Sequence, residues 1–145
     1  MKPHQLFFYQ FRSLYRPFTK KLNVYLAKHQ LYSSQWGMIH LLMKEGPLTV
    51  VDIADRQNIE KPTASRLVQR LKELGYVETI PGKDRREKKI QLSDAGEKVC
   101  AEILETIEQF QKDALEGISE EEQLEASRLL AKVRANLLKR GEHRE

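Results

Sequence analysis

Residues 49–75 have the sequence TVVDIADRQNIEKPTASRLVQRLKELG, and this stretch predicts two helices separated by a short turn. Thr49 and Asp52 have the three-residue spacing of a capping box, in which each side chain accepts a hydrogen bond from the other residue's backbone N–H. A helix is therefore expected to begin after Thr49 and to run to about Gln57.

The second helix of this stretch is predicted to cover residues 62–74. Pro62 is suited to the first turn, where its missing N–H needs no partner, and Gly75 is suited to the left-handed cap that ends a helix. The apolar positions repeat every three or four residues and form one stripe, namely Ala64, Leu67, Val68, Leu71 and Leu74. We expect that stripe to pack against Ile53 and Ala54 of the first helix.

The opposite face of the 62–74 helix carries hydroxyl, amide and basic side chains. Such groups read base edges in DNA, and an arginine can hold guanine with two parallel hydrogen bonds. The N-terminal turns of a recognition helix make most base contacts, so Thr63, Ser65 and Arg66 are the first candidates. Arg70 and Lys72, further along, are expected to bind phosphates. The complete candidate set is Lys61, Pro62, Thr63, Ser65, Arg66, Gln69 and Arg70.

A charged hairpin is predicted directly downstream. Residues 76–80 and 88–92 alternate apolar and polar side chains as short strands do, and the loop between them is strongly charged. A hairpin in this place could act as a wing that reaches the neighbouring groove. Arg85 and Arg86 suit the narrow, electronegative minor groove, and Asp84 is expected to pair with the guanidinium of Arg86. The candidate wing residues are Lys83, Asp84, Arg85, Arg86 and Lys88.

Each of these two features has an ordinary explanation by itself. Most amphipathic helices place their polar face in solvent, and most charged loops have no binding role. A basic helix face followed by a basic hairpin favours DNA binding. Residues 56–92 carry ten basic and five acidic side chains, whereas residues 93–145 carry eight basic and thirteen acidic ones. A polyanion would be drawn to the middle of the chain and repelled by its C-terminal third, unless the charge simply varies along the chain.

Long helices are predicted on both sides of this middle region. Residues 4–29 have helical apolar spacing, and Pro17 is expected to kink that helix. A second helix over residues 35–45 is expected to be capped by Ser33 or Ser34.

After the hairpin, residues 93–116 are predicted to form a helix that ends before Gly117. Ser119 and Glu122 have the spacing of a second capping box, which opens a last helix. The predicted fold class is mainly α with a small β-hairpin wing.

The terminal helices carry more apolar surface than one neighbour can cover. The first helix spreads its aromatic side chains over more than half of its circumference, and the 93–116 helix has a second apolar line containing Cys100, Leu104 and Leu115. Stripes this wide favour a twofold dimer built from terminal helices. The alternative is a larger monomeric core, which 145 residues in elongated helices would struggle to close. We therefore expect dimerisation regions at residues 1–30 and 93–145, on either side of a DNA-binding region at residues 31–92 that holds the helix pair and the wing.

These residues resemble the multiple-antibiotic-resistance (MarR-type) family of winged helix-turn-helix regulators. The similarity extends over nearly the whole chain, and the stretches that carry it are Gln35–Trp36, Leu48–Ala54, Lys61–Val68, Leu71–Val77 and Asp84–Gly96. The resemblance implies an obligate homodimer whose first and last two helices form the dimer platform. It also implies that Arg86 is the wing arginine with Asp84 as its partner, and that Thr63, Ser65 and Arg66 contact DNA.

The expected function is that of a sequence-specific transcriptional regulator, a repressor, that binds double-stranded DNA as a homodimer. A twofold dimer predicts a pseudo-palindromic operator with half-sites about 10 bp apart. The alternative is a winged-helix module that binds protein and not DNA. That alternative predicts an acidic or apolar recognition face, whereas residues 61–72 contain four basic side chains and no acidic one.

Members of the family commonly release DNA when a small aromatic molecule enters the crevice between the dimer platform and the winged helix. The candidate residues for such a crevice are Phe11, Tyr15, Phe18, Trp36 and His40. Aromatic residues at helical spacing are more often part of a core than of a ligand site. One branch of the family senses oxidants through a cysteine in the first helix. The single cysteine here, Cys100, lies elsewhere and is expected to be buried and inert.

Other classes of function are not expected. The four histidines are scattered without metal-ligand spacing, so neither a metal nor a cofactor is predicted. No nucleophile elbow, phosphate-binding loop or paired-carboxylate motif is recognisable, so an enzyme is not expected. No apolar run approaches the roughly 20 residues that span a bilayer, and no signal peptide is recognisable. A cytoplasmic protein without a membrane partner is expected.

Overall fold

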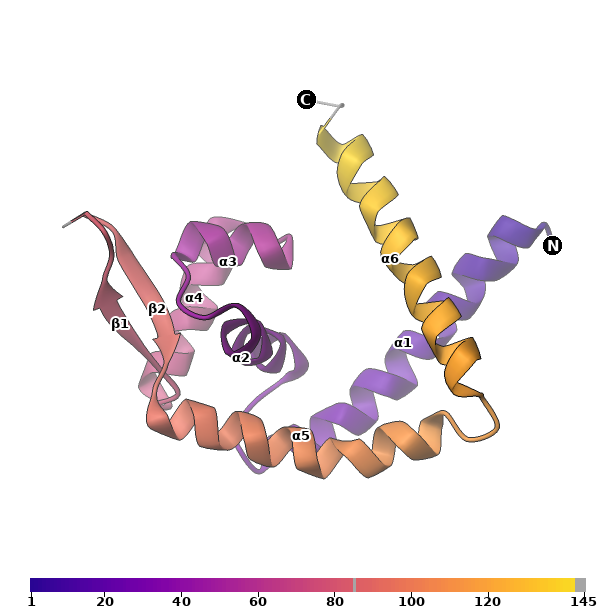
Figure 1. Cartoon of the computed structure of the whole chain (residues 1–145), viewed down its shortest axis with the longest axis horizontal. Helices are drawn as coiled ribbons and strands as arrows, with labels where there is room; N and C mark the ends of the chain where they lie inside the picture. Colours follow the sequence, from indigo (N-terminus) through magenta and orange to yellow (C-terminus); the bar gives the residue numbers. More distant parts are fainter. Residues whose placement is uncertain (85, 143–145) are drawn as a thin grey trace. The chain divides into compact units, whose positions relative to one another are not determined.

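The structure is a computed structural model that describes residues 1–84 and 86–142. It has six helices and a two-stranded antiparallel hairpin in these residues (Figure 1). In chain order the elements are α1 (Pro3–Ala27), α2 (Ser33–Glu45), α3 (Val50–Gln57), α4 (Lys61–Glu73), β1 (Val77–Pro81), β2 (Lys88–Leu92), α5 (Asp94–Ala114) and α6 (Glu120–Glu142). The predicted fold class, mainly α with a small hairpin, is confirmed.

The chain divides into two compact units. The first is Met1–Ile107, which holds α1 to α4, the hairpin and the first part of α5. The second begins at Glu108 and holds the end of α5 and α6.

The core of the first unit lies among the C-terminal part of α1, helices α2 to α4, the hairpin and α5. Its largest fully buried side chains are Leu26, Leu31, Met38, Ile39, Ile53, Leu71, Ile103 and Cys100. The apolar stripe of α4 is confirmed, because Ala64, Val68 and Leu71 are buried and α4 packs against α3. The opposite face of α4 is left outside the core.

Local capping explains where α3 and α4 begin and end. Thr49 Oγ1 accepts a hydrogen bond of 3.1 Å from the backbone N–H of Asp52, and Asp52 Oδ2 accepts one of 3.2 Å from the N–H of Thr49. Asn58, in the left-handed conformation, ends α3. Pro62 lies in the first turn of α4, and Gly75 has a φ of +82° just beyond its end. Thr49, Asp52, Pro62 and Gly75 therefore have their predicted roles, whereas the cap at Asn58 was not predicted.

The hairpin pairs Val77 with Leu92 at its base and Pro81 with Lys88 at its far end. Its first strand begins at Val77, one residue later than predicted, because the N–H of Tyr76 donates to the carbonyl of Leu71 and so belongs to the end of α4. Leu48 adds a short antiparallel bridge to Ile90, with N–O distances of 3.0 and 2.7 Å. The hairpin is thus held by α4 on one side and by the link between α2 and α3 on the other.

The start of α2 differs from expectation. Its N-cap is Tyr32, not Ser33 or Ser34. Gln35 Oε1 accepts a hydrogen bond of 2.9 Å from the Tyr32 N–H, and Asn23 Oδ1 of α1 accepts one of 2.9 Å from the Ser33 N–H. Amide side chains here take the role that was expected of a serine hydroxyl, and α2 begins about two residues earlier than predicted.

In the second unit, α5 ends at Ala114 and a short turn leads to α6. Ser119 Oγ accepts from the Glu122 N–H and Glu122 Oε1 accepts from the Ser119 N–H, both at 3.1 Å, so the predicted second capping box is formed. The bond from the Ser119 N–H is the main cause that lowers the pKa of the Glu122 carboxyl below its usual value, and the nearby Ser119 side chain contributes in the same direction.

Candidate nucleic-acid interface

Helix α4 presents its polar face to solvent. Thr63 is half-buried, and the other predicted residues of this face, Lys61, Pro62, Ser65, Arg66, Gln69 and Arg70, are exposed. The first turn of the helix holds Thr63, and Arg66 Nη2 lies 3.4 Å from Thr63 Oγ1. This contact holds the Arg66 guanidinium over the N-terminal turns of α4, where a recognition helix contacts bases.

Near the C-terminal end of α4, Arg70 forms an ion pair with Glu73. Arg70 Nη1 lies 3.4 Å from Glu73 Oε2, and both side chains are about half exposed. The three-residue spacing of these two residues on a helix is the sequence signal that could have identified the pair. Arg66 and Arg70 therefore have different partners in the structure, a hydroxyl for Arg66 and a carboxylate for Arg70.

The hairpin loop is built by backbone hydrogen bonds. The Gly82 N–H donates to the Glu87 carbonyl at 2.7 Å, and the Glu87 N–H donates to the Asp84 carbonyl at 2.9 Å. The Asp84 carboxylate accepts from the backbone N–H of Arg86 at 3.4 Å. No ion pair joins Asp84 to the Arg86 guanidinium within the described part of the chain, so Asp84 shapes the turn and does not direct the arginine as predicted.

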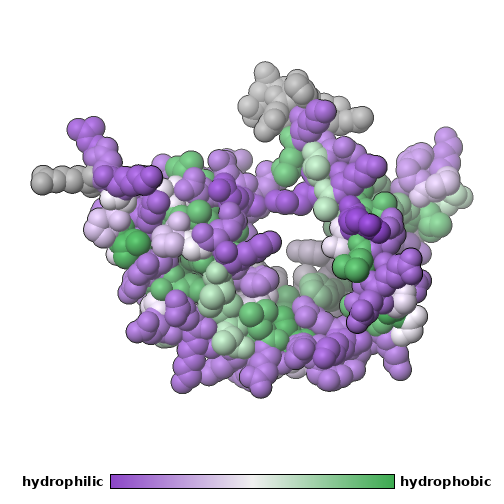
Figure 2. Space-filling model, viewed as in Figure 1, coloured by the Kyte–Doolittle hydropathy of each residue, from purple (hydrophilic) through white to green (hydrophobic). Residues whose placement is uncertain are grey.

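The remaining wing side chains point away from the core. Lys83, Arg86 and Lys88 are exposed, and hydrophilic side chains project at the hairpin end of the face shown in Figure 2, with some hydrophobic ones among them. Arg85, which was also predicted to be a wing residue, lies outside the described residues. The base of the hairpin packs against α4, so the structure brings the predicted helix face and the predicted wing together in one unit.

A cavity of about 590 Å³ lies where α1 approaches the start of α2. Its lining residues are Phe11, Leu14, Tyr15, Phe18, Thr19, Leu22, Ser33 and Ser34. Three of the five predicted crevice residues, Phe11, Tyr15 and Phe18, therefore line one cavity. Trp36 and His40 do not line it; their rings stack on each other with centroids 5.3 Å apart.

Cys100 lies in the core of the first unit. Its side chain has no exposed surface, and burial raises the pKa of its thiol above the usual value. In the part of the chain that the structure describes, no three His, Cys, Asp or Glu side chains are grouped closely enough to hold a metal ion.

Comparisons with known proteins identify the family. A family model described as MarR family matches residues 29–87, which cover α2 to α4, β1 and the hairpin loop. An uncharacterized HTH-type transcriptional regulator of Bacillus subtilis, YwoH, is 36% identical over 107 residues, which cover 74% of this chain and 78% of the relative. The chain belongs to the MarR family.

Other relatives extend the match over nearly all of this MarR-family chain. An uncharacterized HTH-type transcriptional regulator of Staphylococcus aureus, SAV2265, is 30% identical over 139 residues, covering 93% of this chain and 94% of the relative. The MarR-family protein is thus a DNA-binding transcriptional regulator and not an enzyme.

Solved structures support the same assignment. Staphylococcus aureus MarR in complex with salicylate and kanamycin is 29% identical, with a TM-score of 0.83 over 94% of this chain and 93% of that one. A mutant of Escherichia coli MarR complexed with operator DNA has the same fold, with a TM-score of 0.76 and 20% identity over 86% and 90% of the two chains. No helix in the described residues of this MarR-family protein combines the length and apolar character needed to cross a membrane.

Proposed function

We propose that this protein is a sequence-specific transcriptional repressor that acts as a homodimer on a pseudo-palindromic operator. The observation that carries the proposal is the exposed face of α4. Between Lys61 and Lys72 it offers two hydroxyls, one amide and four basic side chains, with no acidic group. Such a face suits the major groove, where these groups read base edges and bind phosphates.

The residues of α4 divide by position. Thr63, Ser65 and Arg66 lie in the N-terminal turns, where base edges come within reach, and Arg66 is held there by Thr63 Oγ1. Gln69 follows one turn later and suits adenine, which an amide can bind with two hydrogen bonds. Lys61, Pro62 and Arg70 lie at the margins of this face. Lys61 would contact a phosphate, whereas Glu73 competes with a phosphate for the Arg70 guanidinium.

The wing would bind the adjacent minor groove. Arg86 is the proposed groove contact, flanked by Lys83 and Lys88, all of them exposed on the hairpin. Asp84, by accepting the Arg86 N–H, fixes the turn from which the guanidinium extends.

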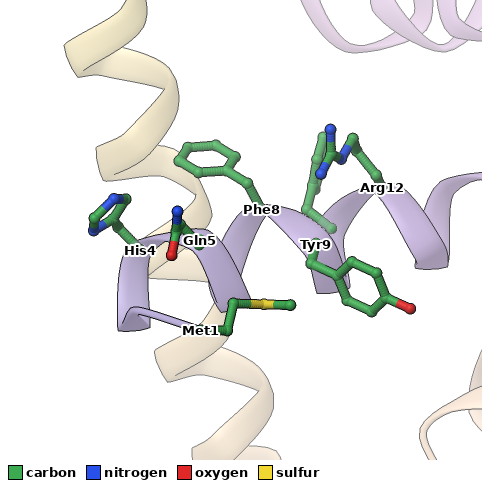
Figure 3. A pocket seen from close by; sticks show the side chains of 7 residues that line it. Met1, His4, Gln5, Phe8, Tyr9 and Arg12 are labelled. Atoms are coloured by element: carbon green, nitrogen blue, oxygen red, sulfur yellow. The ribbon is translucent and has the colours of Figure 1, made fainter.

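The dimer is proposed because the terminal helices expose apolar side chains along their length. On α1, Phe7, Phe8, Tyr9 and Phe11 are each 38–50% exposed, and α6 exposes Leu124, Leu130 and Leu137. Figure 3 shows side chains that line an open hollow along the N-terminal turns of α1, among them Phe8, Tyr9 and Arg12. Monomeric soluble proteins rarely leave such continuous apolar surface uncovered. We assign dimerisation to residues 1–30 and 93–145, and DNA binding to residues 31–92.

A small aromatic effector is the proposed signal. The cavity beside Tyr15 combines aromatic walls with the hydroxyls of Thr19, Ser33 and Ser34. Aromatic acids would place their ring against the walls and their polar groups near the start of α2, where the positive end of the helix dipole favours negative charge. The solved structure of Staphylococcus aureus MarR, which has this fold, is in complex with salicylate and kanamycin, so salicylate is a suitable first probe.

The DNA proposal is tested by selecting bound duplexes from a random pool and measuring their affinity by fluorescence anisotropy. We expect a twofold-symmetric site with half-sites about 10 bp apart, bound more tightly than random duplex at every salt concentration. Arg86→Ala should weaken binding by about 1–3 kcal/mol, and Arg66→Ala should in addition relax base preference at one position. Equal affinity for selected and random duplex would reject sequence-specific binding and favour a protein-interaction module.

The other parts of the proposal have separate tests. Sedimentation velocity of the full chain should give a dimer, and a monomer would reject the dimer model. A reporter gene placed behind the selected site should be expressed less in the presence of the protein if it is a repressor, and more if it is an activator. Salicylate should lower DNA affinity for the wild type and have a smaller effect on Tyr15→Ala; an equal effect on both would place the effector elsewhere.

A further inference from the structure

The residue that links the hairpin to α5 has an unusual number of bonds. Ser93 Oγ donates a hydrogen bond of 2.6 Å to the Gly75 carbonyl and accepts one of 3.1 Å from the Gly96 N–H. The Ser93 N–H donates to the Tyr76 carbonyl at 3.0 Å. One residue therefore holds the turn between α4 and β1 to the start of α5.

Helix capping accounts for only part of this arrangement. An N-cap side chain accepts a hydrogen bond from a free backbone N–H in the first turn of its helix. The Ser93 hydroxyl does so for the N–H of Gly96. The proton that the same hydroxyl gives to the Gly75 carbonyl does nothing for α5. This bond holds Gly75, which lies just beyond the end of α4 and whose own N–H donates to the Lys72 carbonyl.

The packing at this point is as close as the chain allows. A Cβ atom at position 96 would lie 2.0 Å from the carbonyl oxygen of Tyr76, so only glycine lets α5 approach the turn at this distance. Ser93 directly follows Leu92, the last residue of β2, and Tyr76 directly precedes Val77, the first residue of β1. Both ends of the hairpin are thus fixed at one place, together with the end of α4.

We propose that Ser93 is a positioning residue for DNA binding, which fixes the wing relative to α4 through its bond to Gly75. The inference rests on the proposed function, in which α4 and the wing contact one DNA molecule. The Leu48–Ile90 bridge holds the middle of β2 to the other side of the unit, but it does not reach the end of α4. The Ser93 hydroxyl is the side-chain link that sets the wing against the recognition helix.

Three substitutions separate the capping role from the positioning role. Ser93→Thr keeps a hydroxyl that can both donate and accept. Ser93→Asp keeps the acceptor that caps α5 but has no proton for the Gly75 carbonyl, and Ser93→Ala has neither group. Ala95→Asp, an exposed position in the same helical turn, adds the same charge without touching the turn and serves as the control.

The expected order differs between stability and DNA binding. In thermal unfolding, both Ser93→Asp and Ser93→Ala should fall below wild type because both lose the hydrogen bond to the Gly75 carbonyl, and Ser93→Ala should fall further because it also loses the cap of α5. In operator binding, Ser93→Asp and Ser93→Ala should both lose about two- to tenfold, the factor for one net hydrogen bond, while Ser93→Thr and Ala95→Asp bind like wild type.

A double-mutant cycle shows whether the loss acts through the wing. If Ser93 positions the wing, the Ser93→Asp/Arg86→Ala double variant should bind the operator with the same affinity as Arg86→Ala alone. Once the Arg86 side chain is removed, the position of the wing no longer affects that contact. In the Arg66→Ala background, Ser93→Asp should lose the same factor as in wild type.

The outcomes distinguish this inference from the proposed function. Absence of specific DNA binding by the wild type would reject the proposed function itself. Specific binding by the wild type, with Ser93→Asp equal to Ala95→Asp, would reject the positioning role alone. The positioning role would also be rejected if the losses from Ser93→Asp and Arg86→Ala simply multiplied.

Discussion

The phenol oxygen of Tyr76 donates a hydrogen bond of 2.9 Å to the backbone carbonyl of His29, 47 residues earlier in the chain. The bond ties the connection between α1 and α2 to the turn that precedes the wing. Tyr76 is half-buried, and burial raises the pKa of its phenol above the usual value, with a further contribution from the negative charge of Glu102. The phenol therefore keeps its proton, and its role as donor, throughout the neutral range.

Removing this phenol should destabilise the fold without disturbing the packing of the ring. Tyr76→Phe leaves the His29 carbonyl without its donor, and we expect a loss of about 1 kcal/mol in the free energy of unfolding at pH 7. Because the pKa is higher in the folded state, the unfolded state ionises first, above pH of about 10. The advantage of wild type over Tyr76→Phe should thus be constant below that pH and shrink above it. Urea unfolding between pH 7 and 11 measures both; a difference that grows with pH would contradict the assignment.

The ion pair between Arg70 and Glu73 should restrain non-specific DNA binding. Glu73→Gln frees the Arg70 guanidinium, so the protein should gain about one phosphate contact and the slope of log K against log salt should steepen by about 0.9. Glu105→Gln on exposed α5 makes the same change of charge away from the recognition helix and should leave the slope unchanged. Anisotropy titrations with random duplex at four salt concentrations provide the slopes. Equal slopes for both variants would show that Arg70 does not reach a phosphate.

The sequence predicted those parts of the fold whose causes act over a few residues. The Thr49–Asp52 capping box, Pro62 in the first turn and Gly75 with positive φ are all confirmed, because each signal depends only on neighbouring backbone groups. The stripe on α4 could also be predicted, since helical periodicity alone determines which side chains share a face.

Predictions of individual side-chain contacts were less accurate, both between helices and within the wing turn. Trp36 and His40 were expected to line the same crevice as Phe11. Their rings instead stack on each other along α2, and neither residue lines that cavity. The Asp84 carboxylate accepts from the backbone N–H of Arg86 in place of the expected Arg86 guanidinium. Aspartate side chains in turns commonly bind the backbone N–H two residues ahead. The bonds of Ser93 and Tyr76 join segments far apart in the chain, and no local pattern indicates them.

The capping box at the start of α3 offers a direct test of local stability in the helix-turn-helix. Thr49→Ala removes the oxygen that accepts the Asp52 N–H, and we expect it to lower the free energy of unfolding by about 1 kcal/mol. Thr49→Ser restores the hydroxyl and should recover most of that loss. Chemical denaturation followed by circular dichroism gives both values, and an alanine variant as stable as the serine variant would show that the cap contributes little.

Cys100 should not act as a redox sensor. The thiol has no exposed surface, and its raised pKa leaves little of the reactive thiolate at neutral pH. Because the chain has a single cysteine, labelling by a chromogenic disulfide reagent reports this site alone. Labelling should be slow in native buffer and become fast when denaturant unfolds the chain. Peroxide should leave the operator affinity of the wild type and of Cys100→Ala equally unchanged; a loss confined to the wild type would show that the thiol is reached and oxidised in the folded protein.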